Sequence, residues 1–386
     1  MTQGQIILLG PFHFSVIRIL VLVGIIRVAF RREVPEGGLN GLDWLIIIWG
    51  LVALLTALFH NDPKEVFINR LGRACDAVGV YFILRCFCRG LADARILVTA
   101  LAILLLPVAI EMVYEQIAHR NLFSVFGGVA EVPAFREGRF RSEGPFRHPI
   151  LAGTLGAVSA PLFIGILRIA PFAAKIGIFS CLTMVVTSAS SGPLLSLFVS
   201  IFGILLWKWR HLTKQLRIAA VALYIFLEIV MEAPAYFLIA RADIVSGSTG
   251  WHRAAVIQSA IKHIEEWWMV GTDYTRHWMP TGASWSPDHT DITNHYIMIG
   301  VWGGLPLLIG FLICLWLAFK YVGEYVKNNT ESAGYHRFFI WAFGASLFSY
   351  AVTFLSVSFF DQSSIFFYLE LAVISSMRKH VAQQVS

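Results

Sequence analysis

Long apolar runs separated by short polar connections dominate the pattern of this chain. Stretches of about 20 apolar residues recur along it, each long enough to cross a hydrocarbon core roughly 30 Å thick. The predicted spans are residues 6–29, 42–59, 66–88, 96–116, 149–167, 176–189, 193–207, 216–240, 295–319, 338–360 and 364–377. We therefore predict an all-α polytopic membrane protein with about 10–12 transmembrane helices, forming a single integral membrane domain over residues 1–386.

Two connections between the predicted spans are much longer than the others, namely 117–148 and 241–294. Lysine and arginine in short loops mark the cytoplasmic side of a membrane protein. The short connections on one side are rich in these residues: Arg31, Arg32, Arg89, Arg95, Arg168, Lys175, Lys208, Arg210, Lys214, Arg217, Lys320, Lys327, Arg337, Arg378 and Lys379. Those on the other side hold only Lys64. We therefore expect a first external loop, 117–148, and a large external loop, 241–294, on the opposite face.

Composition strengthens the membrane interpretation. Hydrophobic residues make up 57% of the chain and charged residues 14%, against about 25% charged residues in typical soluble domains. A soluble chain of this size needs far more polar surface, so that class is excluded. All the cysteines fall in predicted spans, which argues against a disulfide framework. The first apolar run contains Arg18 and Arg27, so we expect no cleavable signal peptide.

Arginines crowd the end of the first external loop, directly before the span that begins at Pro149. The cluster consists of Arg136, Arg139, Arg141, Arg147 and His148. A planar guanidinium matches phosphate oxygens with two parallel hydrogen bonds, so the cluster suits a lipid-linked phosphate or pyrophosphate. A basic loop that touches anionic headgroups is the simpler alternative. Gly144-Pro145 favours the first interpretation, because it fixes a turn that a headgroup-binding loop does not need.

Charged residues inside predicted spans are costly and usually face the interior of a helix bundle. Arg73 and Asp76 are three positions apart, a spacing that permits an ion pair within one helix. Glu111 and Glu115 stand four apart near the external end of the fourth span. These glutamates either line an external cavity or satisfy groups on neighbouring helices.

The large external loop contains a predicted amphipathic helix over residues 250–268. Its apolar positions recur at spacings of three and four: Trp251, Ala254, Ile257, Ile261, Ile264 and Trp268. A helix lying in the membrane interface explains this pattern. Arg253 sits beside its first turn, where it can face a central cavity.

The remainder of this loop concentrates polar side chains among tryptophans. The polar residues are Arg276, His277, Asp288, His289, Asp291, Asn294 and His295. Tryptophans gather at membrane interfaces, and sugar rings also stack on aromatic faces, so saccharide binding is the sharper interpretation. Asp288-His289-x-Asp291 has the residue types of a metal site, but the set is short. We expect neither a metal nor a cofactor.

Three stretches, taken together, resemble the O-antigen ligase and O-antigen polymerase superfamily of bacterial membrane glycosyltransferases. They are RSEGPFRHPILAG, TSASSGPLLSL, and TGWHR followed by VGTDYTRHW and DITNHYIMIGVWGGL. The resemblance covers roughly residues 136–320. The chain departs from the family pattern at two places. Ser191 stands where an arginine is common, and Asn294-His295 reverses the usual His-Asn order, so either Thr293 or His295 aligns with the usual histidine.

The resemblance implies a glycan transfer on the periplasmic face of the bacterial inner membrane. The donor is an undecaprenyl-pyrophosphate-linked glycan and the acceptor is a sugar hydroxyl on a glycan or glycolipid. The expected reaction is metal-independent and inverting, with membrane lipid and a chain-length regulator as further candidate partners and no nucleic acid. We favour a polysaccharide or O-antigen polymerase; a ligase acting on lipid A-core and a transporter or flippase of lipid-linked sugars are the alternatives.

This chemistry assigns roles to particular side chains. A pyrophosphate leaving group needs fixed cations, and the acceptor hydroxyl needs a base. The predicted substrate-binding residues are Arg141, Arg147, His148, Arg253, Arg276, His277 and Asn294. The first candidates for the base are His295 and His289, because histidine titrates near neutral pH. Asp291, Asp288 and a glutamate of the fourth span are the alternatives.

Overall fold

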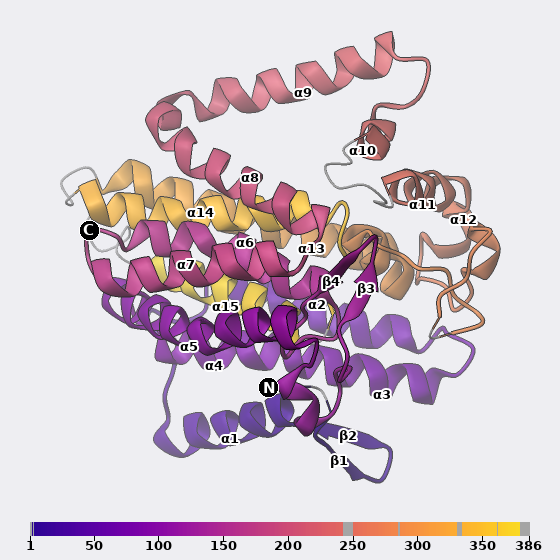
Figure 1. The fold of residues 1–386 in the computed structure, drawn as a ribbon, viewed down its shortest axis with the longest axis horizontal. Helices are drawn as coiled ribbons and strands as arrows, with labels where there is room; N and C mark the ends of the chain where they lie inside the picture. Colours follow the sequence, from indigo (N-terminus) through magenta and orange to yellow (C-terminus); the bar gives the residue numbers. More distant parts are fainter. Residues whose placement is uncertain are drawn as a thin grey trace.

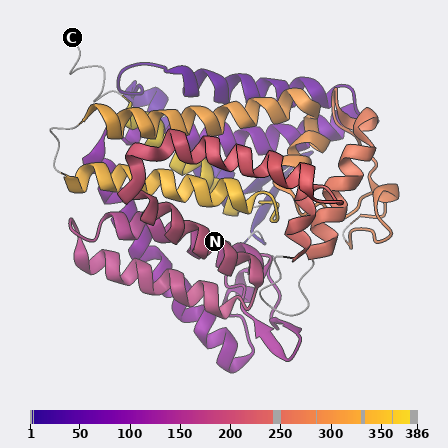
Figure 2. The same cartoon turned by 90° about the horizontal axis from the view of Figure 1, so that it is seen from above.

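A computed structural model describes residues 2, 4–241, 250–284, 286–329, 334–360 and 362–378. Within the predicted large external loop, residues 242–249 and Trp285 lie outside this range, as does Lys379 at the end of the chain. Most of the described chain is helical, and the long helices run side by side along one axis (Figures 1 and 2).

A helix covers most of each predicted span. The long helices are α1 (Val16–Arg31), α2 (Gly41–Ala57), α3 (Pro63–Ala74) continued by η1 (Cys75–Gly79) and α4 (Val80–Phe87), α5 (Leu91–Ala118), α6 (Pro149–Gly165), α7 (Pro171–Thr187), α8 (Ser191–Leu205), α9 (Thr213–Val230), α13 (His295–Asn328), α14 (Gly334–Thr353) and α15 (Gln362–Met377). The short helices are η2 (Leu122–Phe126), η3 (Leu206–Leu212), η4 (Ala235–Phe237), α10 (Leu238–Arg241), α11 (Gly250–Lys262), α12 (Ile264–Trp267) and η5 (Arg276–Trp278).

Within the described residues, three helical stretches are long and apolar enough to cross a membrane, which supports a helical membrane protein. They are Leu91–Ala118, Ser191–Val230 and His295–Asn328. The second contains a non-helical residue, Trp209, and Figure 1 shows that α9 folds back from the end of α8. The α9 helix has no buried residue and stands apart from the bundle, so most of its apolar side chains are exposed.

The first predicted span is wrong over residues 6–15. These residues form an antiparallel hairpin of β1 (Ile6–Leu9) and β2 (Phe12–Ser15), with Leu9 opposite Phe12. Gly10 adopts a φ of 59°, a turn conformation that glycine takes readily. The helix starts only at Val16, where the Ser15 side chain accepts a hydrogen bond from the Arg18 backbone N–H.

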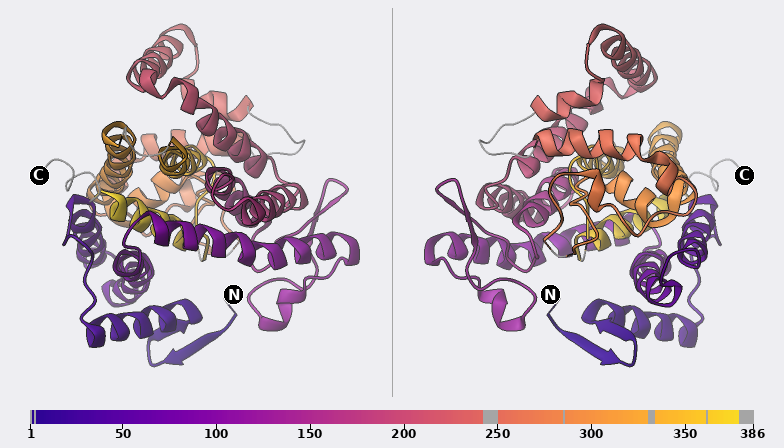
Figure 3. Two further views of the ribbon diagram at one scale, coloured as in Figure 1. Left: turned by 90° about the vertical axis from the view of Figure 1, so that its left-hand side faces the viewer. Right: turned by 90° about the vertical axis from the view of Figure 1, so that its right-hand side faces the viewer.

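The bundle interior is formed by helices rich in small residues. The α6 helix is buried along nearly its whole length, and α15 is also mostly buried inside the bundle (Figure 3). A Cβ atom on Gly156 of α6 would lie 2.9 Å from the Cys181 carbonyl oxygen of α7. Small residues allow such close backbone approach between membrane helices.

The two ends of the bundle differ in the connections they carry. The β3–β4 hairpin (β3, Ala134–Arg136; β4, Arg139–Arg141), α11, α12 and the start of α13 gather at the right-hand end in Figure 1. We call this the loop end. The last turns of α1, α4 and α8 lie at the opposite end, and the basic residues of the short connections follow those turns in sequence.

Candidate functional site

Two of the predicted arginines meet at one turn of the loop end. Arg141 ends β4 and donates a hydrogen bond from Nη2 to Oγ of Ser190, in the turn between α7 and α8, over 2.6 Å. A Cβ atom placed on Gly192, two residues later, would lie 4.0 Å from Nη2 of Arg253 in α11. Both arginines are buried, with 8% and 6% of their surface exposed. We name Arg141, Ser190, Gly192 and Arg253 the arginine node.

The backbone around Arg141 is held by α5. Oε2 of Glu115 accepts hydrogen bonds from the backbone N–H groups of Glu143 and Gly144, at 3.1 and 3.0 Å. Ser142 donates its hydroxyl to the Met112 carbonyl and its N–H to that of Thr187. The sequence RSEGPF is therefore fixed against the ends of α5 and α7, which supports the interpretation of a shaped loop.

The glutamates of α5 serve this loop. Glu111 accepts a hydrogen bond from the Leu122 backbone N–H at 2.9 Å, in the same loop that Glu115 holds. The glutamates thus satisfy backbone groups of the adjoining loop, and not groups on neighbouring helices as one of the two alternatives had it.

Burial and neighbouring positive charges act on the titratable groups at the arginine node. Burial lowers the pKa of Arg141, and the positive charge of Arg136 lowers it further, while Glu143 opposes the change. Burial, with Arg141 and Arg136, also lowers the pKa of His148 to about 4, so this ring is neutral near pH 7. The buried Nε of Arg141 has no hydrogen bond within the described part of the chain. A buried cation in this state gains from an anionic partner.

Arg147 and His295 line a separate cavity of about 920 Å³ at the loop end. Arg73, Arg18 and Trp302 also line it, as do residues of the N-terminal hairpin. We name it the N-terminal cavity. The predicted pyrophosphate set is therefore divided, because Arg141 and Arg253 belong to the arginine node whereas Arg147 faces this cavity.

Asp76, in the continuation of α3, pairs with Arg18 of α1, 3.0 Å from Nη2 to Oδ2. Arg73 lies over the Trp302 ring, 3.9 Å from its centroid. The helix carries a π turn, η1, over Cys75–Gly79, directly beside these residues. Such turns redirect side chains and are frequent at functional sites.

The geometry of His295 restricts its chemistry. Its Nδ1 accepts a hydrogen bond from the Phe359 backbone N–H at 3.3 Å. The neutral ring therefore carries its proton on Nε2 and is a donor there, so His295 is not placed to act as a base. The preceding residue, Asn294, caps α13 by accepting from the Ile297 N–H and donating to the Leu355 carbonyl.

One predicted binding residue, Arg276, and one candidate base, His289, have local partners in the large loop. Arg276 donates to the carbonyl oxygens of Met279 and Pro280, at 2.8 and 3.2 Å. Its guanidinium thus stabilises a local turn of the loop, whereas the sequence predicted that it binds phosphate. His289 shares a hydrogen bond of 2.8 Å between its Nδ1 and Oγ of Ser286.

Asp291 lies beside the start of α11. Nε2 of His252 donates to the Asp291 carbonyl oxygen over 2.8 Å, and His252 directly precedes Arg253. The residue is exposed, so its carboxylate is open to solvent. Of His295, His289 and Asp291, Asp291 is the exposed one, and its backbone carbonyl contacts the residue directly before Arg253.

The predicted amphipathic helix is divided into α11 and α12 at His263. Arg253, Ala254, Val256 and Ala260 form its buried face. Trp251, Ile261 and Trp268 are exposed, at 62%, 57% and 47%. The buried face is thus rotated from the predicted apolar stripe, because the small residues and Arg253 pack inward and the tryptophans remain on the outside.

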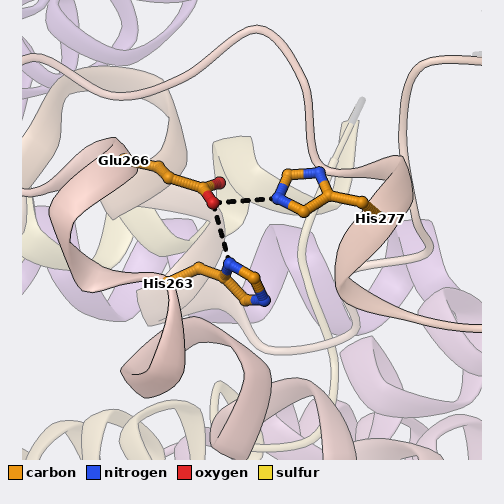
Figure 4. Close-up of side chains that lie close together, drawn as sticks. All are labelled: His263, Glu266 and His277. Atoms are coloured by element: carbon orange, nitrogen blue, oxygen red, sulfur yellow. Dashed lines mark hydrogen bonds and ion pairs between the residues drawn. The ribbon is translucent and has the colours of Figure 1, made fainter.

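His277 belongs to a cluster with His263 and Glu266 (Figure 4). Oε1 of Glu266 lies 2.7 Å from Nδ1 of His263 and 2.9 Å from Nε2 of His277. Oε2 accepts from the indole N–H of Trp278 at 2.9 Å. Burial acts to raise the Glu266 pKa, but the hydrogen bonds from Trp278, His277 and His263 outweigh it and lower the pKa. Within the described residues, these three side chains form a group that could hold a metal ion.

Several residues of the site were not predicted from the sequence. Ser190 was identified only as part of a serine-rich turn, and Glu143 was not assigned a role. The His263–Glu266 spacing of three residues on a helix was available as a signal, since such a pair lies on one face. Trp302 gave no signal, because its partner Arg73 is distant in sequence.

Comparison with known proteins finds no matching family model and no matching curated protein.

Proposed function

We propose that this chain is a bacterial inner-membrane glycosyltransferase of the O-antigen polymerase and ligase type. It moves a glycan from an undecaprenyl-pyrophosphate donor to a sugar hydroxyl on the external, periplasmic face. The observation that carries the proposal is the arginine node, where the RSEGPF, SASSG and WHR segments come together. These are the stretches that resemble the superfamily, and they are distant in sequence.

The arginine node holds the pyrophosphate. Arg141 and Arg253 are buried cations, and the charge of Arg136 adds to the positive potential. A pyrophosphate accumulates negative charge as it leaves the sugar, so preorganised guanidinium groups lower the barrier to transfer. Arg147, six residues from Arg141, provides a cation to the neighbouring N-terminal cavity, which has room for part of the lipid-linked substrate.

Asp291 is the base that accepts the proton of the acceptor hydroxyl. It is exposed to an incoming sugar and lies beside the helix turn that carries Arg253. A single displacement, with the base and the leaving group on opposite sides of the anomeric carbon, inverts that centre. In this step the new glycosidic bond forms as the bond to the pyrophosphate breaks, and the proton moves to the carboxylate.

The proposed topology places the loop end in the periplasm. The helices that coincide with the predicted spans, α9 included, cross the membrane, and the basic short connections lie in the cytoplasm. The polyprenyl tail then stays in the bilayer while its pyrophosphate lies at headgroup depth. Arginines are usually enriched on the cytoplasmic side of membrane proteins, so a cluster of them on the periplasmic side needs another reason, which pyrophosphate binding supplies.

A transfer assay with purified protein and a polyprenyl-pyrophosphate-linked glycan tests the proposal. We expect Arg141→Ala and Arg253→Ala to reduce the rate by about 10²–10³, the typical effect of removing one transition-state donor. Lysine should restore activity only in part, because an ammonium keeps the charge but loses the planar fork. Asp291→Asn should be similarly impaired, whereas Asp288→Asn, in the same exposed loop, should remain active.

Further controls separate catalysis from folding and from the competing functions. Arg210→Ala, at the opposite end of the bundle, should keep wild-type activity, and melting temperatures should be compared for all variants. A product made with a second lipid-linked repeat unit indicates a polymerase, and one made with lipid A-core indicates a ligase. Full activity of both lysine variants, or glycan transport across vesicles without transfer, contradicts the proposal.

A further inference from the structure

Three potential metal ligands converge at the outer edge of the large loop (Figure 4). His263 and Glu266 lie at the junction of α11 and α12, and His277 belongs to η5. Nδ1 of His263, a carboxylate oxygen of Glu266 and Nε2 of His277 all lie within 4.8 Å of one another. Both histidine nitrogens point at the same carboxylate oxygen, at 2.7 and 2.9 Å.

We propose that His263, Glu266 and His277 bind a divalent transition-metal ion of the zinc type. Two imidazole nitrogens and one carboxylate oxygen form a donor set that suits Zn²⁺, whereas Ca²⁺ and Mg²⁺ prefer oxygen ligands alone. A tetrahedral ion roughly 2.1 Å from each ligand requires ligand atoms roughly 3.4 Å apart. The two nitrogen–oxygen separations, 2.7 and 2.9 Å, are somewhat shorter than this value, and all three atoms lie within 4.8 Å, so side-chain rotation is enough to admit the ion.

The groups around the cluster hold its ligands in place. The indole N–H of Trp278 donates to Oε2 of Glu266 at 2.9 Å, which leaves Oε1 directed at the histidines. The His263 ring stacks on Trp278 with an interplanar angle of 10°, and the His277 ring stacks on Tyr274 at the same angle. Partners of this kind orient metal ligands and typically change affinity about 10–100-fold when removed.

The position of the site assigns it a structural role. His263 follows Arg253 by ten residues along α11, a separation of about 15 Å at 1.5 Å per residue. The ion is therefore remote from the proposed transfer step, which continues to rely on arginines. It cross-links α12 to η5 and so fixes the loop segment that packs over α13. This departs from the expectation of a metal-free protein drawn from the sequence.

Direct measurement of bound metal tests this inference. The full chain, purified in detergent with a histidine-free affinity tag, is stripped with EDTA and titrated with zinc sulfate. We expect one zinc ion per chain by elemental analysis and calorimetry, and a higher melting temperature with added zinc, as for any ligand that binds only the folded state. Cobalt(II) should give the visible absorption bands of a four-coordinate site.

Variants connect the signal to these side chains. His263→Ala, His277→Ala and Glu266→Gln should each weaken zinc binding at least about 10²-fold, and Trp278→Phe about 10–100-fold. His289→Ala, which removes a histidine from the same loop, should bind zinc as the wild type does. Glu266→Gln preserves the shape of the side chain and decides the matter if a histidine variant does not fold.

Two results would overturn the inference. The first is no stoichiometric zinc in the stripped and reloaded wild type, which would make the cluster a set of hydrogen bonds alone. The second is wild-type affinity in Glu266→Gln and His277→Ala. Because the readout is metal content, a negative result here leaves the glycan-transfer assay and its interpretation unaffected.

Discussion

At the scale of single residues, the Glu143 carboxyl offers a direct probe of the arginine node. Burial raises its pKa to about 7, outweighing the Ala130 N–H hydrogen bond, while Glu115 adds to the rise and Arg141 opposes it. The unfolded carboxyl has a pKa of about 4.3. Because the folded state holds the proton more tightly, the contribution of this carboxyl to stability is fully present below about pH 4.3. This contribution is lost as the pH rises through about 7.

We therefore expect the melting temperature of the wild type to fall between about pH 5 and pH 8, with Glu143 responsible for part of the decrease. Glu143→Gln should show a smaller decrease and a higher melting temperature than the wild type at about pH 8. Glu131→Gln is the control, since Glu131 is 62% exposed in a surface ion pair with Arg120. Identical pH profiles for Glu143→Gln and the wild type would show that this carboxyl is not perturbed.

At the scale of elements, the break in α13 is the place where the large external loop is hydrogen-bonded to the helix bundle. Gly303 and Gly304 leave the helical conformation, and Gly304 has a φ of 72°. The Leu305 N–H donates to the Trp268 carbonyl at 2.7 Å, and the Thr272 N–H donates to that of Val301 at 3.0 Å. The segment that follows α12 is thus held by backbone hydrogen bonds to the non-helical turn of α13.

Gly304→Ala should destabilise the protein. A Cβ atom there collides with the Met269 carbonyl, and the Gly304 backbone (φ 72°, ψ −173°) lies in a region that essentially only glycine adopts, at a cost of about 1–3 kcal/mol for another residue. Gly323→Ala is the matched control in the same helix: its Cβ meets nothing within 4 Å, and we expect a change between zero and about 1 kcal/mol of stabilisation. Thermal unfolding in detergent compares them, and an equally stable Gly304→Ala would refute the docking role.

At the scale of the whole molecule, the two ends of the bundle are expected to face opposite sides of the membrane. Glu131→Cys and Ser284→Cys place thiols on exposed positions of the two long loops, and Lys214→Cys places one at the other end. In spheroplasts, a membrane-impermeant maleimide should label the first two and reach the third only after permeabilisation. The native cysteines contribute little background, since all but the half-buried Cys75 are buried. The reverse labelling pattern would invert the proposed orientation.

The sequence by itself determined the helices and the end of the bundle at which the polar loops gather. Apolar runs, and the glycine, proline and charged residues that end them, can be identified in short windows of sequence. Helix hydrogen bonds join residues only four positions apart, so such windows are enough to predict a helix. The predicted segments 96–116 and 295–319 thus fall within α5 and α13. The exception is residues 6–15, where alternative local pairing into a hairpin competed with the helix.

Only the tertiary structure decided which polar groups meet. Arg141 and Arg147 look equivalent in sequence, yet one is buried against Ser190 and the other lines the N-terminal cavity. Likewise, Asp76 pairs with Arg18, which lies 58 residues away in the sequence. These pairings form only where segments that are distant in sequence come close enough for hydrogen bonds of about 3 Å. No local sequence pattern determines which segments do so.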